Sequence, residues 1–438
     1  MVGQPLSYAA DPKWISRKKK FTRFCHGKIP GRVFLTDREA NMSQGKTVLI
    51  AGGGYAGIVA ANRLVRKKLP LEIVLVTAQE QFQERIRNHQ LLAGTLKRTY
   101  SVRSLLHKKV KLVIERIAKI EPESKRVILE NGSELGYDHL IYSLGVHGSK
   151  VETSGDSYVG VSDVEACAKM HERIKQNESA KITVLGAGLS GIETAAELSK
   201  VFPKSIVTLV DSNTFGKGFS DEGKNKMIGF FSENNVRILD NTKIIKYADK
   251  KLITANGEEI SHDFCILANG LAASKVGGAS GLRTNPIGQV YVNEFLEVED
   301  HPEIIGAGDC VQVVSSGYDH LRMACATALP MGVYAAERLS HKLGIDSKKG
   351  KIPFSLAYLG RNVSLGREDG VIQESNPDDS PTDKIWTAKS AKWIKELICK
   401  FTILSFRFEK SFDFYFWKSF SENKEEFASG TLATETEK

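Results

Sequence analysis

The sequence lacks the features that mark several classes of protein. It has no run of about 18 uncharged apolar residues, so no membrane-spanning helix is predicted. Its six cysteines form no C-x-x-C pair or other metal-like cluster, which argues against structural zinc and a disulfide framework. The start lacks the apolar segment of a secretory signal. These absences favour a cytoplasmic protein that touches a membrane at most peripherally, on its cytoplasmic face.

What is present is the balance of a globular protein. The 438 residues suffice for about three domains. Hydrophobic residues make up 41% of the chain and charged residues 26%. The net charge of +9 lies at the ends, with +6 in residues 1–41 and +4 in residues 385–420, which leaves −1 for the body. This distribution argues against a nucleic-acid partner. We expect a disordered basic extension at 1–45 and a tail at 421–438.

A first strand-turn-helix pattern begins at residue 46. The apolar run KTVLIA at 46–51 predicts a buried parallel strand, IVAANRLVRK predicts a helix, and EIVLV at 72–76 predicts a second strand. The spacing G-x-G-x-x-G lets a pyrophosphate approach the backbone at the positive end of that helix. It predicts a dinucleotide site, against the alternative of a tight turn without a ligand. The candidate residues are Gly52, Gly54, Tyr55, Ala56 and Gly57.

The same pattern returns further along the chain, with strands predicted at 181–185 and 205–210. Its turn offers Gly186, Gly188 and Gly191. The second strand leads to Asp211, whose carboxylate is placed to bind both hydroxyls of an adenosine ribose and would repel a 2′-phosphate. NADH is therefore favoured over NADPH, and the alternative is a solvated aspartate at a strand end. Thr77 stands at the equivalent place in the first repeat, so ribose recognition there is expected to be weaker or supplied by another residue.

Each repeat is followed by a region with several predicted strands, which ends in a buried strand. Tight turns are predicted at Asn131-Gly132 and at Asn256-Gly257. Later, residues 353–373 are typical of strands and turns. Residues 374–383 are predicted to be a polar linker, and a helical, aromatic-rich segment follows from Thr387.

Together these motifs resemble a known family. One strand-rich region ends on Ser143-Leu144-Gly145, the other ends on Ala268-Asn269-Gly270, and IIGAGDC follows at 304–310. Over about residues 46–373 the chain resembles the two-dinucleotide-domain flavoproteins of the pyridine nucleotide oxidoreductase superfamily. Within that group it is most similar to type II NADH dehydrogenases and to the related NADH:quinone reductases that resemble apoptosis-inducing factor.

The resemblance implies an α/β fold with two Rossmann-like dinucleotide-binding domains, arranged as in glutathione reductase, and a small C-terminal region. FAD is expected in a domain formed by 46–155 and 270–345, and NADH in a domain inserted at 156–269. Residues 346–420 form the C-terminal region. The implied activity is that of an FAD-dependent oxidoreductase, which takes hydride from NADH and passes electrons to a quinone-type acceptor.

The resemblance also implies roles for single residues. Asp309, after Gly308, would bind the ribityl chain of FAD. Glu193 would lie beside nicotinamide and flavin as the catalytic residue, with a structural role as the alternative. In the helix after Asp309, Thr327 and Ala328 stand where type II dehydrogenases commonly carry glutamine.

Further cofactor contacts are expected around the ends of the two strand-rich regions. Gly145 and Gly270 close those regions. Arg85 belongs to the segment FQERIRNHQ, whose polar groups could serve a pyrophosphate or a reduced flavin ring. The alternative for this segment is a solvated helix face. Its polar members are Arg85, Arg87, His89 and Gln90.

Thiol chemistry is not expected, because residues 78–100 contain no cysteine where disulfide reductases of the superfamily carry a C-x4-C pair. No metal site is predicted. Two other functions stay open, a soluble NADH-dependent reductase of a small redox protein and a flavoprotein that senses NADH without turnover. Homodimer formation also stays open.

The segment 391–417 predicts an amphipathic helix. Apolar residues recur with helical spacing, and Lys392, Lys395, Glu396 and Lys400 lie mainly on the other side. Aromatic residues beside lysines are typical of helices that lie in a headgroup layer. Type II NADH dehydrogenases attach to membranes by C-terminal helices, so the resemblance supports peripheral membrane contact here. The alternative is packing on the protein's own core or on a second copy. The apolar residues are Ile394, Leu397, Ile398, Phe401, Leu404 and Phe408.

Overall fold

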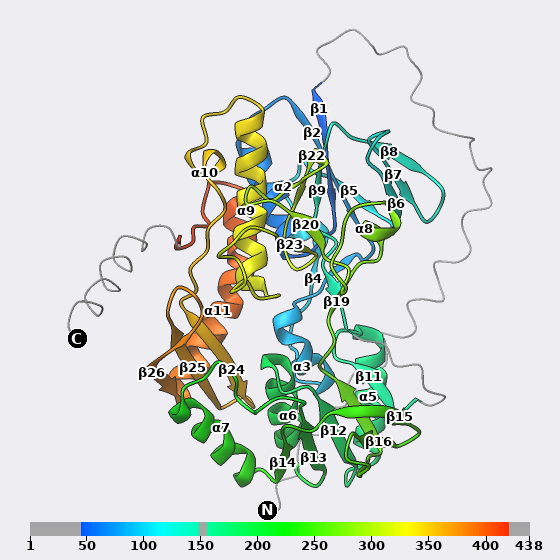
Figure 1. Cartoon of the computed structure of the whole chain (residues 1–438), viewed down its shortest axis with the longest axis vertical. Helices are drawn as coiled ribbons and strands as arrows, with labels where there is room; N and C mark the ends of the chain where they lie inside the picture. Colours follow the sequence, from blue (N-terminus) through cyan, green and yellow to red (C-terminus); the bar gives the residue numbers. More distant parts are fainter. Residues whose placement is uncertain (1–44, 149–155, 420–438) are drawn as a thin grey trace, which may run out of the picture. The chain divides into compact units, whose positions relative to one another are not determined.

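The structure is a computed structural model that describes residues 45–148 and 156–419 (Figure 1). The expected basic extension, apart from residue 45, and the expected tail lie outside these residues. Within the described part, two sheets of mainly parallel strands carry the fold, and helices pack against them. The predicted α/β class is therefore confirmed.

The first sheet has six strands and contains the first glycine turn. Five strands run parallel and β21 at the edge pairs antiparallel to β22. The predicted strand 46–51 coincides with β1, because its continuous apolar run is buried on both faces. In spatial order the strands are β21 (Glu297–Val298), β22 (His301–Gly306), β9 (His139–Tyr142), β1 (Lys46–Ala51), β2 (Leu71–Thr77) and β5 (Lys111–Ile114).

The second sheet repeats this arrangement with five parallel strands. Its central strand β12 coincides with the predicted strand 181–185, and β13 begins one residue later than predicted. In spatial order the strands are β11 (Tyr158–Gly160), β18 (Phe264–Leu267), β12 (Lys181–Leu185), β13 (Ile206–Val210) and β14 (Val236–Leu239).

In each sheet a helix follows the strand that ends at the glycine turn. Helix α2 follows β1 and packs along α9, where Gly332 of α9 lies close to the backbone of Ala56. Figure 1 shows α9 in yellow and α11 in orange on this side of the first sheet. Helix α6 follows β12 in the second half. The longer helices are α2 (Tyr55–Arg66), α5 (Val164–Gln176), α6 (Leu189–Val201), α7 (Asp221–Glu233), α9 (Cys325–Lys342) and α11 (Ala388–Glu409).

The two strand-rich regions form small antiparallel sheets. Asn131-Gly132 connects β7 to β8, and Asn256-Gly257 connects β16 to β17, so both predicted turns are confirmed. The strands are β6 (Ile117–Glu121), β7 (Arg126–Leu129), β8 (Glu134–Gly136), β15 (Ile244–Ala248), β16 (Lys251–Thr254) and β17 (Glu259–Ser261). The shorter elements are β3 (Gln81–Phe82), η2 (Arg85–Arg87), α3 (Asn88–Leu92), β4 (Tyr100–Ser101), α4 (Val102–Leu105), β10 (Val146–His147), β19 (Ala272–Ala273), α8 (Val276–Ala279), β20 (Val290–Val292), β23 (Val311–Val313) and α10 (Lys348–Lys351).

The predicted linker at 374–383 is wrong. Strand β25 (Asp369–Ser375) lies between β24 (Gly360–Leu365) and β26 (Pro381–Thr387) in an antiparallel sheet. Between β25 and β26 the chain makes a tight turn, closed by the hydrogen bond from the Asn376 amide to the Ser380 carbonyl. Pro381 fits because it is the first residue of an edge strand, where its missing N–H is tolerated.

The C-terminal helix packs on the protein, one of the alternatives left open for it, but with a different face from its apolar stripe. Helix α11 packs against β25 and α2 with a mixed face that buries Lys395, Cys399 and Phe406. The predicted apolar stripe lies largely outside, with Leu397 65% exposed and Phe401 37% exposed. Hydrophobic periodicity did not identify the inner face of the helix, because that face contains a buried charged residue, Lys395. Among the described residues, every helix is too short or too polar to cross a bilayer.

Candidate functional site

The two glycine turns have the same construction. Gly52 and Gly186 follow β1 and β12 with φ of +116° and +106°, a conformation that L side chains rarely adopt. A Cβ on Gly57 or Gly191 would collide with the carbonyl oxygen of the first glycine of its turn. Each helix therefore starts directly at the end of its strand.

The middle glycines face open space. A Cβ on Gly54 or on Gly188 would meet no atom within 4 Å. Both residues are N-caps, of α2 and α6, and neither has a side chain that bonds the first amides of its helix. Free amides at a helix N-terminus beside an open cradle fit the pyrophosphate of a dinucleotide.

A cleft of about 590 Å³, the first-turn cleft, opens beside the first turn. Thr77 lies at its side, and the Thr77 hydroxyl is within hydrogen-bond distance of the Gln79 backbone. Gln79 and Glu115 line the same cleft and supply the polar groups that Thr77 does not. Sequence reasoning missed both, because they follow strand ends without a motif. The cleft is lined by Gly52, Gly54, Tyr55, Thr77, Gln79, Arg85, Glu115, Ser143 and Gly145, among others.

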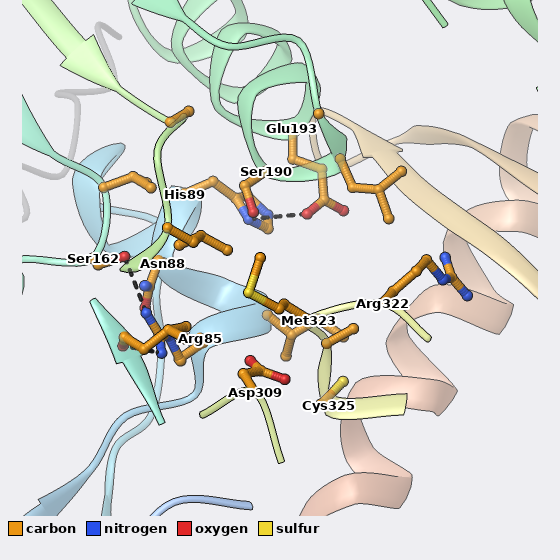
Figure 2. Close-up of a pocket in the computed structure, with 18 of the residues that line it drawn as sticks. Arg85, Asn88, His89, Ser162, Ser190, Glu193, Asp309, Arg322, Met323 and Cys325 are labelled. Carbon is orange, nitrogen blue, oxygen red and sulfur yellow. Dashed lines mark hydrogen bonds and ion pairs between the residues drawn. The ribbon is translucent and has the colours of Figure 1, made fainter. Parts of the chain in front are cut away.

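A second cavity of about 380 Å³, the central pocket, is lined by residues from both halves of the protein and from α11 (Figure 2). Figure 2 shows His89 and Glu193 on one side of this pocket, with Asp309 and Cys325 on the other. Arg85 and Tyr55 line both the first-turn cleft and the central pocket, so the two cavities adjoin. Other lining residues are Asn88, Gly188, Leu189, Ser190, Asn269, Arg322 and Lys395.

Asp309, which lines the central pocket, has an unsatisfied oxygen. Its Oδ1 atom is buried and has no hydrogen-bond partner among the residues that the structure describes. Burial raises the pKa of Asp309 to about 6, although the Arg85 guanidinium favours the charged form. A buried carboxylate oxygen without a partner calls for a donor from outside the chain, and a ligand hydroxyl provides one. Asp309 therefore fits the role expected for it toward FAD.

Glu193 is the centre of a buried cluster. Its Oε1 lies 2.8 Å from the Lys395 Nζ atom and accepts a hydrogen bond from the Ser364 amide at 2.9 Å. The Oε2 atom lies 3.5 Å from Nδ1 of His89. Each of these four side chains is buried. Lys395, predicted only to lie on the charged side of its helix, is buried here, and no local pattern could have revealed a partner about 200 positions away.

The charges in this cluster hold one another in place. Burial opposes the charge on Glu193, but Lys395 and His89 bring the pKa of Glu193 below its ordinary value. Burial likewise opposes the charge on Lys395, and Glu193 raises the pKa of Lys395 above its ordinary value. Burial, helped by nearby Lys395, lowers the pKa of His89 to about 4, against the attraction of Glu193. At neutral pH the pocket thus holds an ion pair and a neutral imidazole.

The segment around Arg85 is not a solvated helix face. Arg87, His89 and Gln90 are buried, and Arg87 pairs with Glu84 at 2.9 Å and with Glu396 at 2.8 Å. Arg85 donates to the Val146 carbonyl at 2.5 Å. This segment therefore contacts both the central pocket, through Arg85 and His89, and α11, through Arg87.

The remaining predicted residues lie close to these cavities or support them. Asp211 accepts the amides of Ala187 and Asn213, which places it against the second turn. Gly270 lies between Asn269 and Leu271, both of which line the central pocket. Gly308 has φ of +85° and precedes Asp309.

Three residues contribute packing rather than an open surface. Ala56 and Ala328 are buried, both near Gly308. The Thr327 hydroxyl is occupied by the Arg322 carbonyl and the Tyr358 hydroxyl, although Thr327 lines a smaller cavity of about 180 Å³ next to Asp309.

Comparison with known proteins assigns the chain to a family. The family model for pyridine nucleotide-disulphide oxidoreductases matches residues 46–332, and the chain belongs to this family. Membership implies FAD and NADH, so the chain is an FAD-dependent oxidoreductase.

Its curated relatives are distant but nearly as long. Human ferroptosis suppressor protein 1 is 27% identical over 348 residues, which cover 75% of this chain and 88% of that protein. The type II NADH:quinone oxidoreductase of Staphylococcus haemolyticus is 25% identical, with 74% and 89% covered.

Solved structures show the same fold. The sulfide:quinone oxidoreductase of Aquifex aeolicus matches with a TM-score of 0.71 at 18% identity, covering 83% of this chain and 92% of that one. NDH2 from Plasmodium falciparum, in complex with NADH, matches with a TM-score of 0.68 at 15% identity, covering 84% and 97%.

Proposed function

We propose that the protein takes hydride from NADH onto FAD and passes the electrons to a quinone-type acceptor at a membrane surface. The observation that carries this proposal is the central pocket, because the second glycine turn, Asp309 and Arg85 all line it. Two nucleotides that enter from the two turns would meet there. The quinone is suggested by the names of relatives, which include a type II NADH:quinone oxidoreductase.

Each cofactor has its own set of residues in this proposal. FAD would extend from the first-turn cleft into the central pocket, held by the turn from Gly52 to Gly57, by Arg85 and Gly145, and by Asp309 in the central pocket. NADH would lie against Gly186, Gly188 and Gly191, with Asp211 at its ribose. The proposed domains are 46–155 with 270–345 for FAD, 156–269 for NADH and 346–420 for the C-terminal region. When bound, FAD would supply the redox chemistry, which is acceptance of hydride and release of electrons.

Glu193 is proposed as the catalytic residue because it fixes a cation inside the central pocket. The carboxylate holds Lys395 Nζ at 2.8 Å, and the Ser364 amide and hydroxyl fix the carboxylate in turn. Lys395 carries a proton at Nζ and stabilises negative charge that develops in the pocket. His89 stays neutral and adds no second positive charge.

Membrane contact is proposed through the outer side of 391–417, on the cytoplasmic face. Exposed apolar side chains continue along α11 and past its end, and we name this set the exposed ridge. Large aromatic groups on the surface of a helix are suited to the headgroup boundary of a bilayer. Sedimentation of the purified protein would show whether it forms a homodimer. The ridge consists of Trp393, Leu397, Phe401, Leu404, Phe408, Phe412 and Phe416.

The experiment is a spectrum followed by an acceptor panel. Purified protein should be yellow, and NADH added without oxygen should bleach it. Turnover should be faster with a short-chain quinone than with a small iron–sulfur protein, and vesicles should raise the rate with a long-chain quinone. A protein that cannot be loaded with FAD would refute the proposal. Fast turnover with the iron–sulfur protein alone would support a soluble reductase instead.

A further inference from the structure

A further surface cavity, a groove of about 890 Å³, is lined by Arg87 and Gln90 of the same segment from which Arg85 and His89 line the central pocket. It runs between α11 and the residues that follow α3, and we name it the basic groove. None of its residues has a role in the proposed electron transfer. It is lined by Glu84, Arg87, Gln90, Gly94, Thr95, Leu96, Lys97, Arg98, Tyr100, Arg367, Lys392, Trp393, Glu396, Cys399, Lys400, Ile403, Leu404 and Arg407.

The charge of the groove is unbalanced. Its two acids are already engaged, since Arg87 pairs with Glu84 and Glu396, and Arg367 lies 3.6 Å from Glu396. Five further cations have no carboxylate within 4 Å in the part of the chain that the structure describes. The two acids thus neutralise Arg87 and Arg367, while the five other cations keep the groove positive. The five are Lys97, Arg98, Lys392, Lys400 and Arg407.

The rim of the groove is also the edge of the exposed ridge. Trp393 and Leu404 belong to both, and Trp393 is 67% exposed. The charged and the apolar surfaces therefore share residues on one helix. A ligand that satisfies both must carry a negative charge next to a long apolar part.

We propose that the basic groove binds the phosphate headgroup of an anionic phospholipid, whose acyl chains follow the exposed ridge into the bilayer. The inference rests on the proposed membrane contact and adds a ligand of defined chemistry to it. A neutral lipid would use the ridge and leave the cations unmatched. Free phosphate would use the cations and leave the ridge in water. A phospholipid with net negative charge matches both surfaces.

Vesicle sedimentation of the FAD-loaded full chain tests this proposal. Vesicles of phosphatidylcholine with a minority of phosphatidylglycerol should bind at least about tenfold more tightly than vesicles of phosphatidylcholine alone. The triple variant Lys97→Gln, Arg98→Gln and Lys400→Gln should weaken binding to the anionic vesicles about a hundredfold, at about 1 kcal/mol for each cation. These three side chains are exposed, so folding and flavin absorbance should not change.

A matched control separates a site from diffuse positive charge. The variant Lys243→Gln, Lys246→Gln and Lys250→Gln removes the same charge from exposed positions around β15 and should leave vesicle binding unchanged. Equal losses in the two triple variants would overturn the proposal, as would equal affinity for the two kinds of vesicle. Displacement of the protein from vesicles by inorganic phosphate at the same phosphate concentration would assign the groove to a free anion instead.

The same samples keep this proposal apart from the oxidoreductase activity. Bleaching by NADH and turnover with a short-chain quinone need no vesicle. If these persist while the preference for anionic vesicles is absent, the headgroup site is wrong and the electron transfer stands. If the preference is present and bleaching fails, the reverse holds.

Discussion

Helices α2 and α6 start from the same kind of turn, yet they present different side chains at the same register. Glu193 of α6 corresponds to Val59 of α2, and Glu197 corresponds to Arg63. Helix α11 contacts both, with Lys395 on Glu193 and Glu409 on Arg63 at 2.7 Å. These two residues of α11 are about 21 Å apart at 1.5 Å per residue. The repeat has thus kept the turns and diverged on the helix faces, and one later helix complements both.

The two turns are predicted to differ in ligand although they share geometry. Gly54→Val should remove the yellow colour completely, because its Cβ would meet no protein atom within 4 Å and the valine side chain would occupy the open cradle. Gly188→Val should leave the protein yellow and abolish rapid bleaching by NADH. Absorbance of the purified variants, followed by anaerobic stopped flow, measures both effects.

Gly52→Ala is the matched control for the first turn. Its Cβ would collide with the Ser143 carbonyl, so it should lower thermal stability as well as FAD content. Loss of FAD in the Gly188→Val variant, or retention of FAD in Gly54→Val, would show that the ligands are assigned to the wrong turns.

The two ends of α11 should respond differently to removal of a charge. Glu409→Gln leaves Arg63 with the carboxylates of Glu337 and Asp413 and the carbonyl of Tyr415, and Lys395→Met leaves Glu193 buried without its cation. Breaking a buried pair costs about 3 kcal/mol, so both variants should lose unfolding free energy of that order. Turnover with NADH should fall at least about tenfold in Lys395→Met, one 1.4 kcal/mol step in barrier, and stay close to wild type in Glu409→Gln. Denaturant titration and steady-state kinetics separate the two ends. Equal loss of turnover would mean that Lys395 acts only through stability.

Local patterns predicted the local parts of this molecule. Both strand-turn-helix units and both Asn-Gly turns follow from short-range chemistry, and β1 and β12 match to the residue. The faces of α11 could not be predicted, because Lys395 is buried only by virtue of Glu193, which lies far away in sequence. The strand β26 was missed for a related reason. The polar sequence of β26 forms a strand only because β25 offers it a pairing partner at the edge of a sheet.

The pH dependence of stability should reveal His89, which lies beside Glu193 of the second repeat. Its pKa is about 4 in the folded protein and about 6.5 when unfolded, so the unfolded chain binds the extra proton. Its contribution is fully present above pH 6.5 and is lost as the pH falls toward 4, by about 3 kcal/mol. The variant His89→Asn should lose correspondingly less over this window, as measured by denaturant titration at each pH. Parallel losses in the two proteins would show that His89 is not buried in its neutral form.

The smallest predicted effect concerns the ribose ends of the two turns, Asp211 and Thr77. Asp211→Arg should shift the ratio of kcat/KM for NADH over NADPH toward NADPH by about tenfold or more, since one charge-assisted hydrogen bond contributes about 1.5 kcal/mol. Asp211→Thr copies the first repeat and should weaken NADH without favouring NADPH. Because Asp211 also accepts the Ala187 amide, thermal unfolding of both variants must be compared before the kinetics are interpreted. An unchanged ratio in a stable Asp211→Arg variant would mean that another residue contacts the ribose, and the second turn would then resemble the first, where the residue at this position is Thr77.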